Sequence, residues 1–395
     1  MARSLLHTPE GVRDIYNQEC AGKMVLQENL QGLLKQYGYA AIQTPTFEFF
    51  DIFGREIGTT PSKDLYKFFD REGNTLVLRP DITPSVARSV TKYFAEEDMP
   101  VRLYYQGNTF INNSSYQGRL KESTQLGAEF IGDDSVDADA EIISLVVDAL
   151  KTAGLKEFQI TIGHAKFLKG LVEEAGLDAD TIEELESLIS NKNFFGVEEL
   201  VASLPMKEDL KVLFQKLGCI YNSADELKEV KILAQEYPIL VNSIERLIQL
   251  YEILTYYCIE GYISIELGMI STYRYYTGII FAGYTFGTGE AIVKGGRYDD
   301  LLPYFGKNAP SIGFAVVVDQ LMAALSRQKI EIPVQNRCKL VVYQPEKQKE
   351  AISMAKEQRA AGEEIMLCCW SVEKSKEDYI AYAKRFYCTE VVFLQ

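Results

Sequence analysis

The sequence predicts an α+β protein in which an antiparallel sheet is flanked by helices, with a helical insertion and a small C-terminal α/β unit. Three observations predict this fold. Short β-favouring runs over residues 1–160 are separated by Gly, Pro and Asn, which favours hairpins over parallel crossovers. Residues 166–258 carry helical periodicity instead, and residues 337–395 alternate strand-like and helix-like segments. We therefore expect a core over residues 1–330 and a separate unit over residues 337–395.

The elements of the core are predicted from the spacing of apolar residues and from the residues that end helices and strands. A helix is predicted over Lys23–Gln36, where apolar residues recur at near-helical spacing and Gly38 provides a stop. Strands are predicted before the insertion at Thr75–Leu78, Val101–Tyr105, Ala128–Ile131 and Phe158–Ile162. Further strands are predicted after the insertion at Tyr262–Leu267, Gly278–Tyr284, Glu290–Val293 and Ile312–Val318. The insertion thus interrupts the sheet.

Capping residues and a proline mark the remaining boundaries. Thr181 and Ser223 each stand three residues before a glutamate, as in an N-terminal capping box. Ile332–Gln335 contains proline and is predicted to be a linker. The final unit is expected to contain, in order, a strand at Lys339–Tyr343, a helix at Lys347–Ala361, a strand at Glu364–Cys368, a helix opened by Ser371 and running to about Phe386, and a strand at Glu390–Leu394.

Composition excludes several classes of protein. The 395 residues include 56 Asp and Glu against 41 Lys and Arg, and this net charge of −15 disfavours binding to a phosphate backbone. Residues 1–14 lack an apolar targeting segment, and no run approaches eighteen uninterrupted apolar residues. We therefore expect a cytoplasmic protein that binds neither nucleic acid nor membrane.

Histidine and cysteine are too few or too scattered to predict a metal centre. His7 and His164 are the only two histidines, and the seven cysteines show no C-x-x-C spacing. We expect reduced, mostly buried thiols, no metal and no cofactor. The sequence also lacks both common glycine-rich nucleotide motifs, so Gly287–Gly289 and Gly295–Gly296 are expected to mark turns or bulges.

More specific motifs occur in four separated segments. In chain order they are Gly11–Asp14 with Tyr37–Tyr39 and Thr44–Glu48; Leu78–Thr83; Gly118–Arg119 through Gln125–Glu129; and Tyr275–Gly278 with Gly295–Asp299 and Gly313–Ala315. Together they resemble the catalytic core of histidyl-tRNA synthetase, which has a class II aminoacyl-tRNA synthetase fold. The resemblance covers about residues 8–325, and the final unit resembles a shortened anticodon-binding domain.

Adenylation of an amino acid requires guanidinium groups directed at the ATP phosphates. The arginine positions of the three corresponding family motifs hold Ile111, Ser271 and Gln320, and Asn113 replaces a motif glutamate. Loss of one preorganised donor commonly costs about 2.7–4 kcal/mol, or ~100- to 1000-fold in rate. The resemblance therefore implies a synthetase-like core without synthetase chemistry and without a catalytic residue.

The amino-acid end of the pocket is better preserved. The resemblance implies a histidine site that offers Asp81, Thr83 and Gln125 to the ammonium group, and Glu129 and Tyr276, with Tyr275 beside them, to the imidazole. The alternative is a vestigial pocket with a structural role only. Candidate anion or carboxylate contacts are Arg119, Arg274 and Arg297, and for Arg119 and Arg297 an internal ion pair is the alternative.

A retained histidine pocket without ATP chemistry resembles the ATP phosphoribosyltransferase regulatory subunit family. The segment Gly278–Glu290, running into Gly295–Asp299 and Gly313–Asp319, is more similar to that family than to an active synthetase. The resemblance implies a homodimer within a hetero-oligomer that contains a short-form catalytic subunit. It also implies that the chain is required for transferase activity and contributes to histidine feedback on the first step of histidine biosynthesis.

Two other functions stay open at this stage. One is an active histidyl-tRNA synthetase with an atypical ATP site, and the other is a free histidine-sensing module. The near-neutral charge of residues 337–395, which end at a predicted strand, suits a packing or partner-docking unit better than an anticodon reader.

Overall fold

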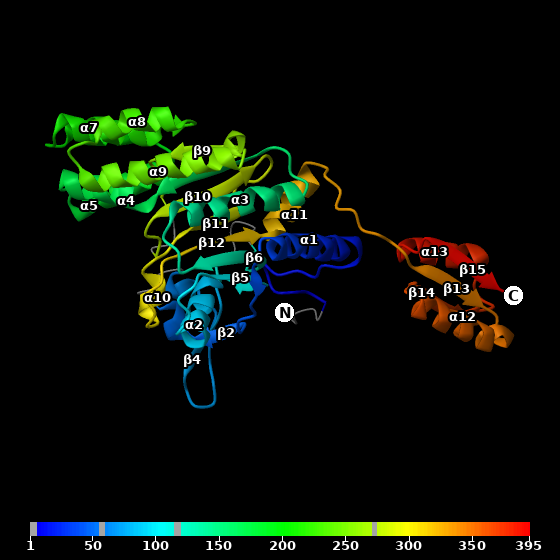
Figure 1. The fold of residues 1–395 in the computed structure, drawn as a ribbon. Coiled ribbons are helices and arrows are strands. Elements are labelled where there is room, and N and C mark those ends of the chain that lie inside the picture. The colour runs from blue at the N-terminus through cyan, green and yellow to red at the C-terminus, as the bar shows by residue number, and fades with distance from the viewer. Residues whose placement is uncertain (1–5, 55–59, 114–119, 271–274) are drawn as a thin grey trace. The chain divides into compact units, whose positions relative to one another are not determined.

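The structure, a computed structural model, describes residues 6–54, 60–113, 120–270 and 275–395. The chain divides into two compact units, Met1–Asp14 with Leu26–Glu331, and Ile15–Val25 with Ile332–Gln395. Figure 1 colours the chain by residue number and labels its helices and strands.

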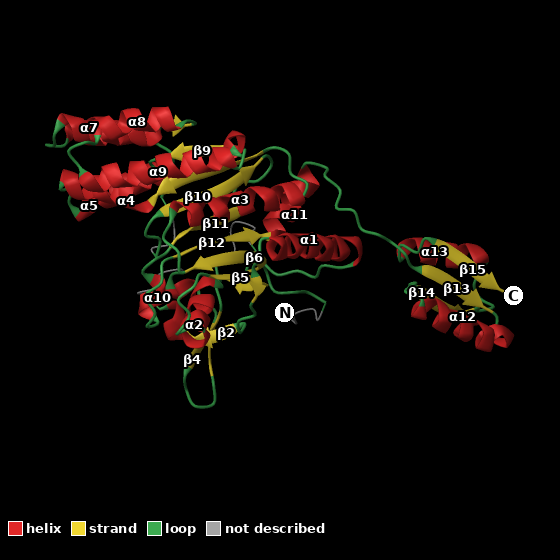
Figure 2. Ribbon diagram, in the orientation of Figure 1, coloured by secondary structure: helices red, strands yellow, loops and turns green. Residues whose placement is uncertain are grey.

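A nine-stranded sheet forms the centre of the first unit, in the order β1-β5-β6-β12-β11-β10-β7-β9-β8 (Figure 2). Its strands are β1 (Ala40–Ala41), β5 (Val101–Phe110), β6 (Glu122–Ile131), β7 (Phe158–His164), β8 (Ile220–Tyr221), β9 (Ile263–Glu266), β10 (Ile279–Thr285), β11 (Val293–Arg297) and β12 (Ser311–Val317). Pairing is antiparallel except between β1 and β5 and between β7 and β9. The mixed helix and sheet architecture confirms the predicted fold class.

A second, smaller sheet lies before the first long hairpin. Its antiparallel strands are β2 (Phe47–Phe49), β4 (Thr75–Leu78) and β3 (Lys67–Phe69), in the order β2-β4-β3. β4 occupies the four predicted residues. Helix α2 (Thr83–Tyr93) follows it, packs against the short α10 (Leu301–Tyr304), and buries its apolar face in a core cluster with Tyr105 and Tyr298.

Helix α1 confirms the predicted glycine stop. It spans Asn17–Gln36, beginning six residues before the predicted start. Gly38 adopts a φ of +82°, a conformation that glycine enters without steric cost. The backbone N–H of Tyr39 then donates to the carbonyl of Leu34 at 3.1 Å, which satisfies one of the last free carbonyls of the helix.

Helix α3 (Val136–Thr152) was not predicted, although it links β6 to β7 and packs against β12. Its sequence contains the run Ile142–Val147, and those residues are buried almost completely. A continuous apolar run of this length cannot be assigned to a helix or to a buried strand by its period alone. The same apolar run therefore gave no helix signal, whereas the cap at Ser135, which accepts from the Ala138 N–H, is a sequence feature that marks its start.

The insertion consists mainly of helices. They are α4 (Ala165–Ala175), α5 (Ala179–Ser190), α6 (Phe194–Ser203), α7 (Glu208–Gln215), α8 (Ala224–Leu233) and α9 (Pro238–Tyr256). Figure 2 shows them grouped beside the β9 end of the large sheet, to which β8 adds the edge strand. The predicted cap at Ser223 is confirmed, because its side chain accepts from the Glu226 N–H. The predicted cap at Thr181 is wrong, because Asp178 caps α5 instead and accepts from the Thr181 N–H at 2.9 Å.

The strand predicted at Glu290–Val293 is wrong in its position. β11 begins at Val293 and continues to Arg297, so Gly295 and Gly296 lie within the strand instead of in a turn or bulge. The reason is close packing on both faces: a Cβ at Gly295 would lie 2.2 Å from the Phe281 ring. By contrast, Gly287 does occupy a turn, at a φ of +84°.

The second unit contains a parallel sheet in the order β14-β13-β15 with a helix on each face. Its elements are β13 (Lys339–Tyr343), α12 (Gln348–Ala360), β14 (Ile365–Cys369), α13 (Lys376–Arg385) and β15 (Glu390–Leu394). Leu340 and Val342 pack with α13, while Val341 packs with α12, so β13 is buried on both faces. Ser375 caps α13 in a capping box with Asp378, so the predicted opening at Ser371 is wrong.

Candidate functional site

Glycines in the central strands make room for buried polar side chains. In β12, Gly313 pairs with Glu129 of β6 on one side and with Gly296 of β11 on the other, so these positions share one face of the sheet. Gly127 lies on that face too, because side chains alternate along β6. A Cβ at Gly313 would lie 1.7 Å from Oε2 of Glu129, and a Cβ at Gly296 would lie 2.9 Å from the Tyr276 ring. We call Gly127, Gly296 and Gly313 the glycine floor.

Glu129 lies at the centre of this face and is 1% exposed. Its Oε1 accepts from the Thr83 hydroxyl at 2.7 Å, and its Oε2 accepts from the Tyr298 hydroxyl at 2.5 Å. Burial raises the pKa of Glu129 to about 8, although both hydroxyl donors act in the opposite direction. Among the described residues no lysine or arginine pairs with it. Near neutral pH the carboxyl group is therefore mostly protonated until a cation approaches it.

Asp81 brings a second buried carboxyl group to the start of α2. Its Oδ1 accepts from the backbone N–H groups of Ile82 at 2.7 Å and Thr83 at 3.5 Å, while its Oδ2 accepts from the Tyr275 hydroxyl at 3.3 Å. Burial raises the pKa of this carboxyl group as well. The turn between β4 and α2 thus places Asp81 and Thr83 beside the same cluster.

Three tyrosines surround the two carboxyl groups. The ring of Tyr275 meets those of Tyr276 and Tyr298 edge-on, with centroid distances of 4.8 Å and 5.8 Å. Tyr276 rests over Gly296 of the glycine floor. The segment before β10 therefore places Tyr275 and Tyr276 beside the carboxyl groups that β6 and the start of α2 provide. We call these two tyrosines the aromatic wall.

Two buried polar atoms beside the cluster have no hydrogen-bond partner among the described residues. They are the Tyr105 hydroxyl and Oε1 of Gln125. Gln125 shares the floor face of β6 with Glu129, and the Tyr105 hydroxyl lies 2.6 Å from where a Cβ of Gly127 would stand. Such orphaned groups are rare in folded proteins and mark positions where a ligand or water completes the bonding.

The structure brings together most of the histidine-site residues that the sequence predicts. The hydrogen bonds and ring contacts join Asp81, Thr83, Glu129, Tyr275 and Tyr276. Gln125 lies on the same strand face without a bond to them. Tyr105 and Tyr298 were missed. A signal for Tyr298 was present, since it belongs to the quoted segment Gly295–Asp299, where it directly follows Arg297.

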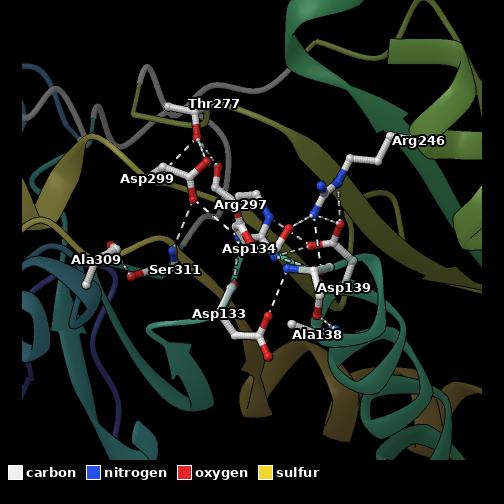
Figure 3. A network of polar contacts seen from close by, with 11 residues as sticks. Asp133, Asp134, Ala138, Asp139, Arg246, Thr277, Arg297, Asp299, Ala309 and Ser311 are labelled. Atoms are coloured by element: carbon white, nitrogen blue, oxygen red, sulfur yellow. Dashed lines mark hydrogen bonds and ion pairs between the residues drawn. The ribbon is translucent and has the colours of Figure 1, made fainter. Parts of the chain in front are cut away.

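The predicted anion contacts are not all described, and the one that is described makes internal bonds. Arg119 and Arg274 lie outside the described residues. Arg297 donates from Nε and Nη2 to Oδ1 of Asp139 at 2.9 and 2.6 Å, and from Nη1 to the Asp133 carbonyl and to Asp299. Figure 3 shows that this network lies at the junction of β11 with the start of α3. The guanidinium of Arg297 is thus paired within the chain, which matches the internal ion-pair alternative for this residue.

The same network reaches the insertion and the aromatic wall. Arg246 of α9 donates from Nε to Oδ2 of Asp139 at 2.7 Å, so one carboxylate holds two guanidiniums (Figure 3). Asp299 accepts from the Thr277 hydroxyl at 3.1 Å and from the Ser311 N–H at 3.1 Å. Thr277 directly follows Tyr276, so these bonds help to hold the segment that carries the wall.

Two of the three motif positions at which the family resemblance implies an arginine are described, and they hold Ile111 and Gln320. Ile111 and Asn113 follow β5, and the Nδ2 of Asn113 donates to the Leu120 carbonyl at 3.5 Å. Gln320 stands in the first turn of α11. The third position, Ser271, lies outside the described residues.

Among the described residues, no group of three or more His, Cys, Asp or Glu side chains is arranged so that it could hold a metal ion. His164 caps α4 by accepting from the Lys166 N–H, and burial lowers its pKa to about 3. All seven cysteines are free, but each is partly or fully exposed, so the prediction of mostly buried thiols is wrong. None of the described helices has the length and apolar character needed to cross a membrane.

Curated relatives identify the family to which this chain belongs. It is 40% identical to the ATP phosphoribosyltransferase regulatory subunit of Acetivibrio thermocellus over 365 residues, which cover 92% of this chain and 86% of that protein. It is 39% identical to the protein of the same name from Ruminiclostridium cellulolyticum, covering 90% of this chain and 84% of the relative. The chain belongs to the ATP phosphoribosyltransferase regulatory subunit family.

This family shares its fold with a synthetase. The family model for histidyl-tRNA synthetase matches residues 11–321. A crystal structure from Bacillus halodurans, titled an ATP phosphoribosyltransferase regulatory subunit/histidyl-tRNA synthetase, superposes with a TM-score of 0.87 at 30% identity, covering 99% of this chain and 98% of that one. The predicted resemblance to the ATP phosphoribosyltransferase regulatory subunit family and to the class II synthetase fold is confirmed.

Proposed function

We propose that this chain is a non-catalytic regulatory subunit of ATP phosphoribosyltransferase. In this role a short-form catalytic subunit requires it for activity, and it contributes to histidine feedback on the first step of histidine biosynthesis. The observation that carries the proposal is a buried cluster with two carboxyl groups, in a chain whose motif positions hold Ile111 and Gln320 in place of arginine.

The chemistry of the pocket supports histidine as the effector. Free histidine carries an ammonium group and an imidazole, so it brings several N–H donors and one or two positive charges. Asp81 and Glu129 are buried and accept only from neutral donors among the described residues, and a cationic ligand relieves that desolvation. Oε1 of Gln125 is a further acceptor in need of a donor. We assign the ammonium to Asp81, Thr83 and Gln125, and the imidazole to Glu129 and Tyr276, beside Tyr275.

The ligand carboxylate requires a cation of its own. We propose Arg274 for that contact, with Arg119 as a further candidate for an anion. Arg297 is the weakest of the three candidates, because its guanidinium already donates to Asp139, Asp299 and the Asp133 carbonyl.

The missing arginine charges argue against amino-acid adenylation by this chain. The triphosphate and the developing negative charge in adenylation require preorganised guanidiniums, and each one lost costs about 2.7–4 kcal/mol in transition-state stabilisation. The side chains of Ile111 and Gln320 carry no charge to replace them. We therefore propose that the chain contains no catalytic residue and that the phosphoribosyl transfer takes place on the partner.

Exposed aromatic residues support a homodimer within the hetero-oligomer. The small sheet turns Phe47, Phe49 and Phe69 toward solvent, each more than half exposed. A cluster of exposed aromatic side chains of this kind is typical of a surface that another chain covers. We propose residues 1–330 as the synthetase-like core, with its insertion at about 166–258, and residues 337–395 as a shortened anticodon-binding-like unit that packs or docks.

The test of the partnership is an activity assay with both subunits. The purified chain is mixed with a short-form catalytic subunit, and phosphoribosyl transfer to ATP is measured with each chain alone and with both. We expect activity from the mixture and co-elution of the two chains on gel filtration. If the added chain neither stimulates the transferase nor co-elutes with it, the proposal is wrong, and histidine binding in calorimetry would then favour a free sensor.

The test of the effector site uses two substitutions and a matched control. Glu129→Ala and Tyr276→Phe remove an imidazole contact each, so both are expected to weaken histidine inhibition of the complex while gel filtration shows unchanged assembly. Tyr284→Phe removes the same hydroxyl from a partly exposed position on β10 and is expected to leave inhibition unaltered. Unchanged inhibition in both pocket variants would show that histidine binds elsewhere.

An active synthetase is the second candidate, favoured by the match of residues 11–321 to the histidyl-tRNA synthetase family. Histidine-dependent exchange of pyrophosphate into ATP separates the two functions. The regulatory role predicts no exchange by the isolated chain, whereas robust exchange would establish a synthetase with an atypical ATP site.

A further inference from the structure

Two cysteine side chains of the second unit lie in contact. Cys338 stands directly before β13, and Cys388 stands two residues before β15. Their sulfur atoms are 3.6 Å apart, and both side chains are half-buried. Fifty positions separate them in the sequence, so the contact is made by the fold and not by chain proximity.

The backbone around both cysteines is fixed by regular structure. The Thr389 N–H donates to the Cys338 carbonyl at 2.8 Å, which extends the β13–β15 pairing to the residues beside the two thiols. The Cys388 N–H donates to the Ala383 carbonyl at 2.9 Å and closes the end of α13, where Tyr387 has a φ of +55°. The thiols therefore face each other from a strand end and a helix cap, which hold their Cβ atoms in place.

The two sulfurs differ in their surroundings. The Cys388 thiol donates toward the Cys338 sulfur, and burial together with that neighbour raises the pKa of Cys388 to about 11. Cys388 therefore retains its proton, and the Cys338 thiol donates toward the Lys339 carbonyl at 3.9 Å. A cavity of about 400 Å³, with Asn336 and Lys384 in its lining, borders Cys388 and is large enough for a small peroxide. Cys338 does not line it but contacts the Cys388 sulfur at 3.6 Å.

We propose that Cys338 and Cys388 form a peroxide-responsive thiol pair that closes to a disulfide. The Cys338 sulfur attacks one peroxide oxygen and loses its thiol proton to solvent, the O–O bond breaks, and the sulfur becomes a sulfenic acid while hydroxide leaves and takes a proton from solvent. The Cys388 sulfur then attacks the sulfenic sulfur, the S–O bond breaks, and the thiol proton leaves with the hydroxyl as water. Two thiols are oxidised, and one hydrogen peroxide is reduced to two waters.

The disulfide would fasten the last strand of the unit. It would join the residue that leads into β13 to the segment between α13 and β15, so β15 would be held to its neighbour covalently as well as by backbone bonds. Opening of that edge of the sheet becomes less frequent in the oxidised form, because a cross-link restricts the unfolded chain more than the folded one.

The test is peptide mapping of the full-length chain after treatment with hydrogen peroxide. We expect the peptides that contain Cys338 and Cys388 to be joined, with the loss of two hydrogen atoms, and to separate again with dithiothreitol. Cys369→Ser is the control, because Cys369 is exposed at the end of β14, and it is expected to leave the cross-link intact. Absence of the joined peptide, with both thiols still free, would overturn the proposal.

Two further measurements test the order of the steps and its structural effect. In Cys388→Ser, a dimedone probe is expected to label a sulfenic acid at Cys338, and failure to label it would show that Cys338 is not the attacking sulfur. Amide hydrogen exchange of Val391 and Phe393 in β15 is expected to slow in the oxidised wild-type chain and not in peroxide-treated Cys388→Ser. Equal exchange before and after oxidation would overturn the fastening of β15.

Discussion

Asp139 and Glu129 are two buried carboxyl groups of one core with opposite surroundings. The side chain of Asp139 has no exposed surface and holds Arg297 and Arg246, at 2.6 Å in each pair. Glu129 is 1% exposed and holds the hydroxyl groups of Thr83 and Tyr298. Burial raises the pKa of both, but only at Asp139 do two guanidiniums act against that rise.

The difference distinguishes a carboxyl group with a structural role from one that is suited to bind a ligand. The charge of Asp139 is balanced within the chain, and the network it forms ties α3, α9 and β11 together. Glu129 has no such cationic partner among the described residues, and a ligand that brings a positive charge would favour its ionised form. A buried carboxyl group that lacks a cation is thus a better guide to a binding site than one that is paired.

Breaking the Asp139 network is expected to have the largest effect on stability. In Asp139→Asn two guanidiniums keep their positions but lose the carboxylate between them, and such a loss typically costs about 3–5 kcal/mol. Arg246 is partly exposed and regains water, so we expect a value near the lower end. The free energy of unfolding from urea titration measures it.

The matched control is Asp299→Asn, whose side chain is about one-third exposed and lies 3.3 Å from Arg297. Because solvent screens this pair, we expect less than half of the loss seen with Asp139→Asn. Equal losses in the two variants would show that the doubly paired carboxylate has no special part in holding the core.

Much of the fold could be predicted from the sequence, because the hydrophobic periodicity was clear and residues such as Gly38 marked where elements end. The strands at Thr75–Leu78, Lys339–Tyr343 and Glu390–Leu394 match their predicted bounds, and Gly38 ends α1 as expected. Helix α3 was missed because its continuous apolar run, Ile142–Val147, does not distinguish a helix from a buried strand. The shift of β11 has a similar cause, since Gly295–Gly296 mimic a turn in sequence but serve close packing in the sheet.

The sequence named most residues of the cluster around Glu129, but it did not show which of its charged groups are paired. Motif resemblance named Glu129 and Arg297 together, and only the three-dimensional contacts show that Arg297 serves Asp139 instead. Tyr105 was missed because a buried tyrosine in an apolar strand has no distinguishing pattern. Its position above Gly127 depends on pairing between strands, which a single sequence does not reveal.

Filling the glycine floor is expected to have the next largest effect. In Gly313→Ala the new Cβ would lie 1.7 Å from Oε2 of Glu129, so the carboxyl group or the strand must move, at a typical cost of about 1–3 kcal/mol. Histidine binding, measured by calorimetry, is expected to fall as well, because the displaced group is the proposed imidazole acceptor. Gly32→Ala, which meets nothing within 4 Å on α1, is the control and is expected to be neutral or stabilising. An unaltered Gly313→Ala protein would mean that the floor does not set the position of Glu129.

The smallest expected change per measured step is a pH dependence to which Glu129 contributes. Its pKa is about 8 in the folded chain against 4.5 for the ordinary side chain, so the folded state keeps a proton that the unfolded state releases. The stability linked to this proton is complete below pH 4.5 and is lost as the pH rises toward 8, at no more than about 1.4 kcal/mol per pH unit. Glu129→Gln removes this loss, because the amide does not titrate.

The measurement is the difference in unfolding free energy between wild type and Glu129→Gln at pH 6, 7 and 8. His164, whose pKa of about 3 in the folded chain costs stability as the pH falls below its usual value of 6.5, is present in both proteins and cancels. We expect the wild type to lose stability relative to the variant at each step. Saturating histidine should then reverse this trend, because a bound cation restores the ionised carboxylate. Parallel curves with and without histidine would mean that Glu129 is balanced like Asp139, and the contrast between the two carboxyl groups would disappear.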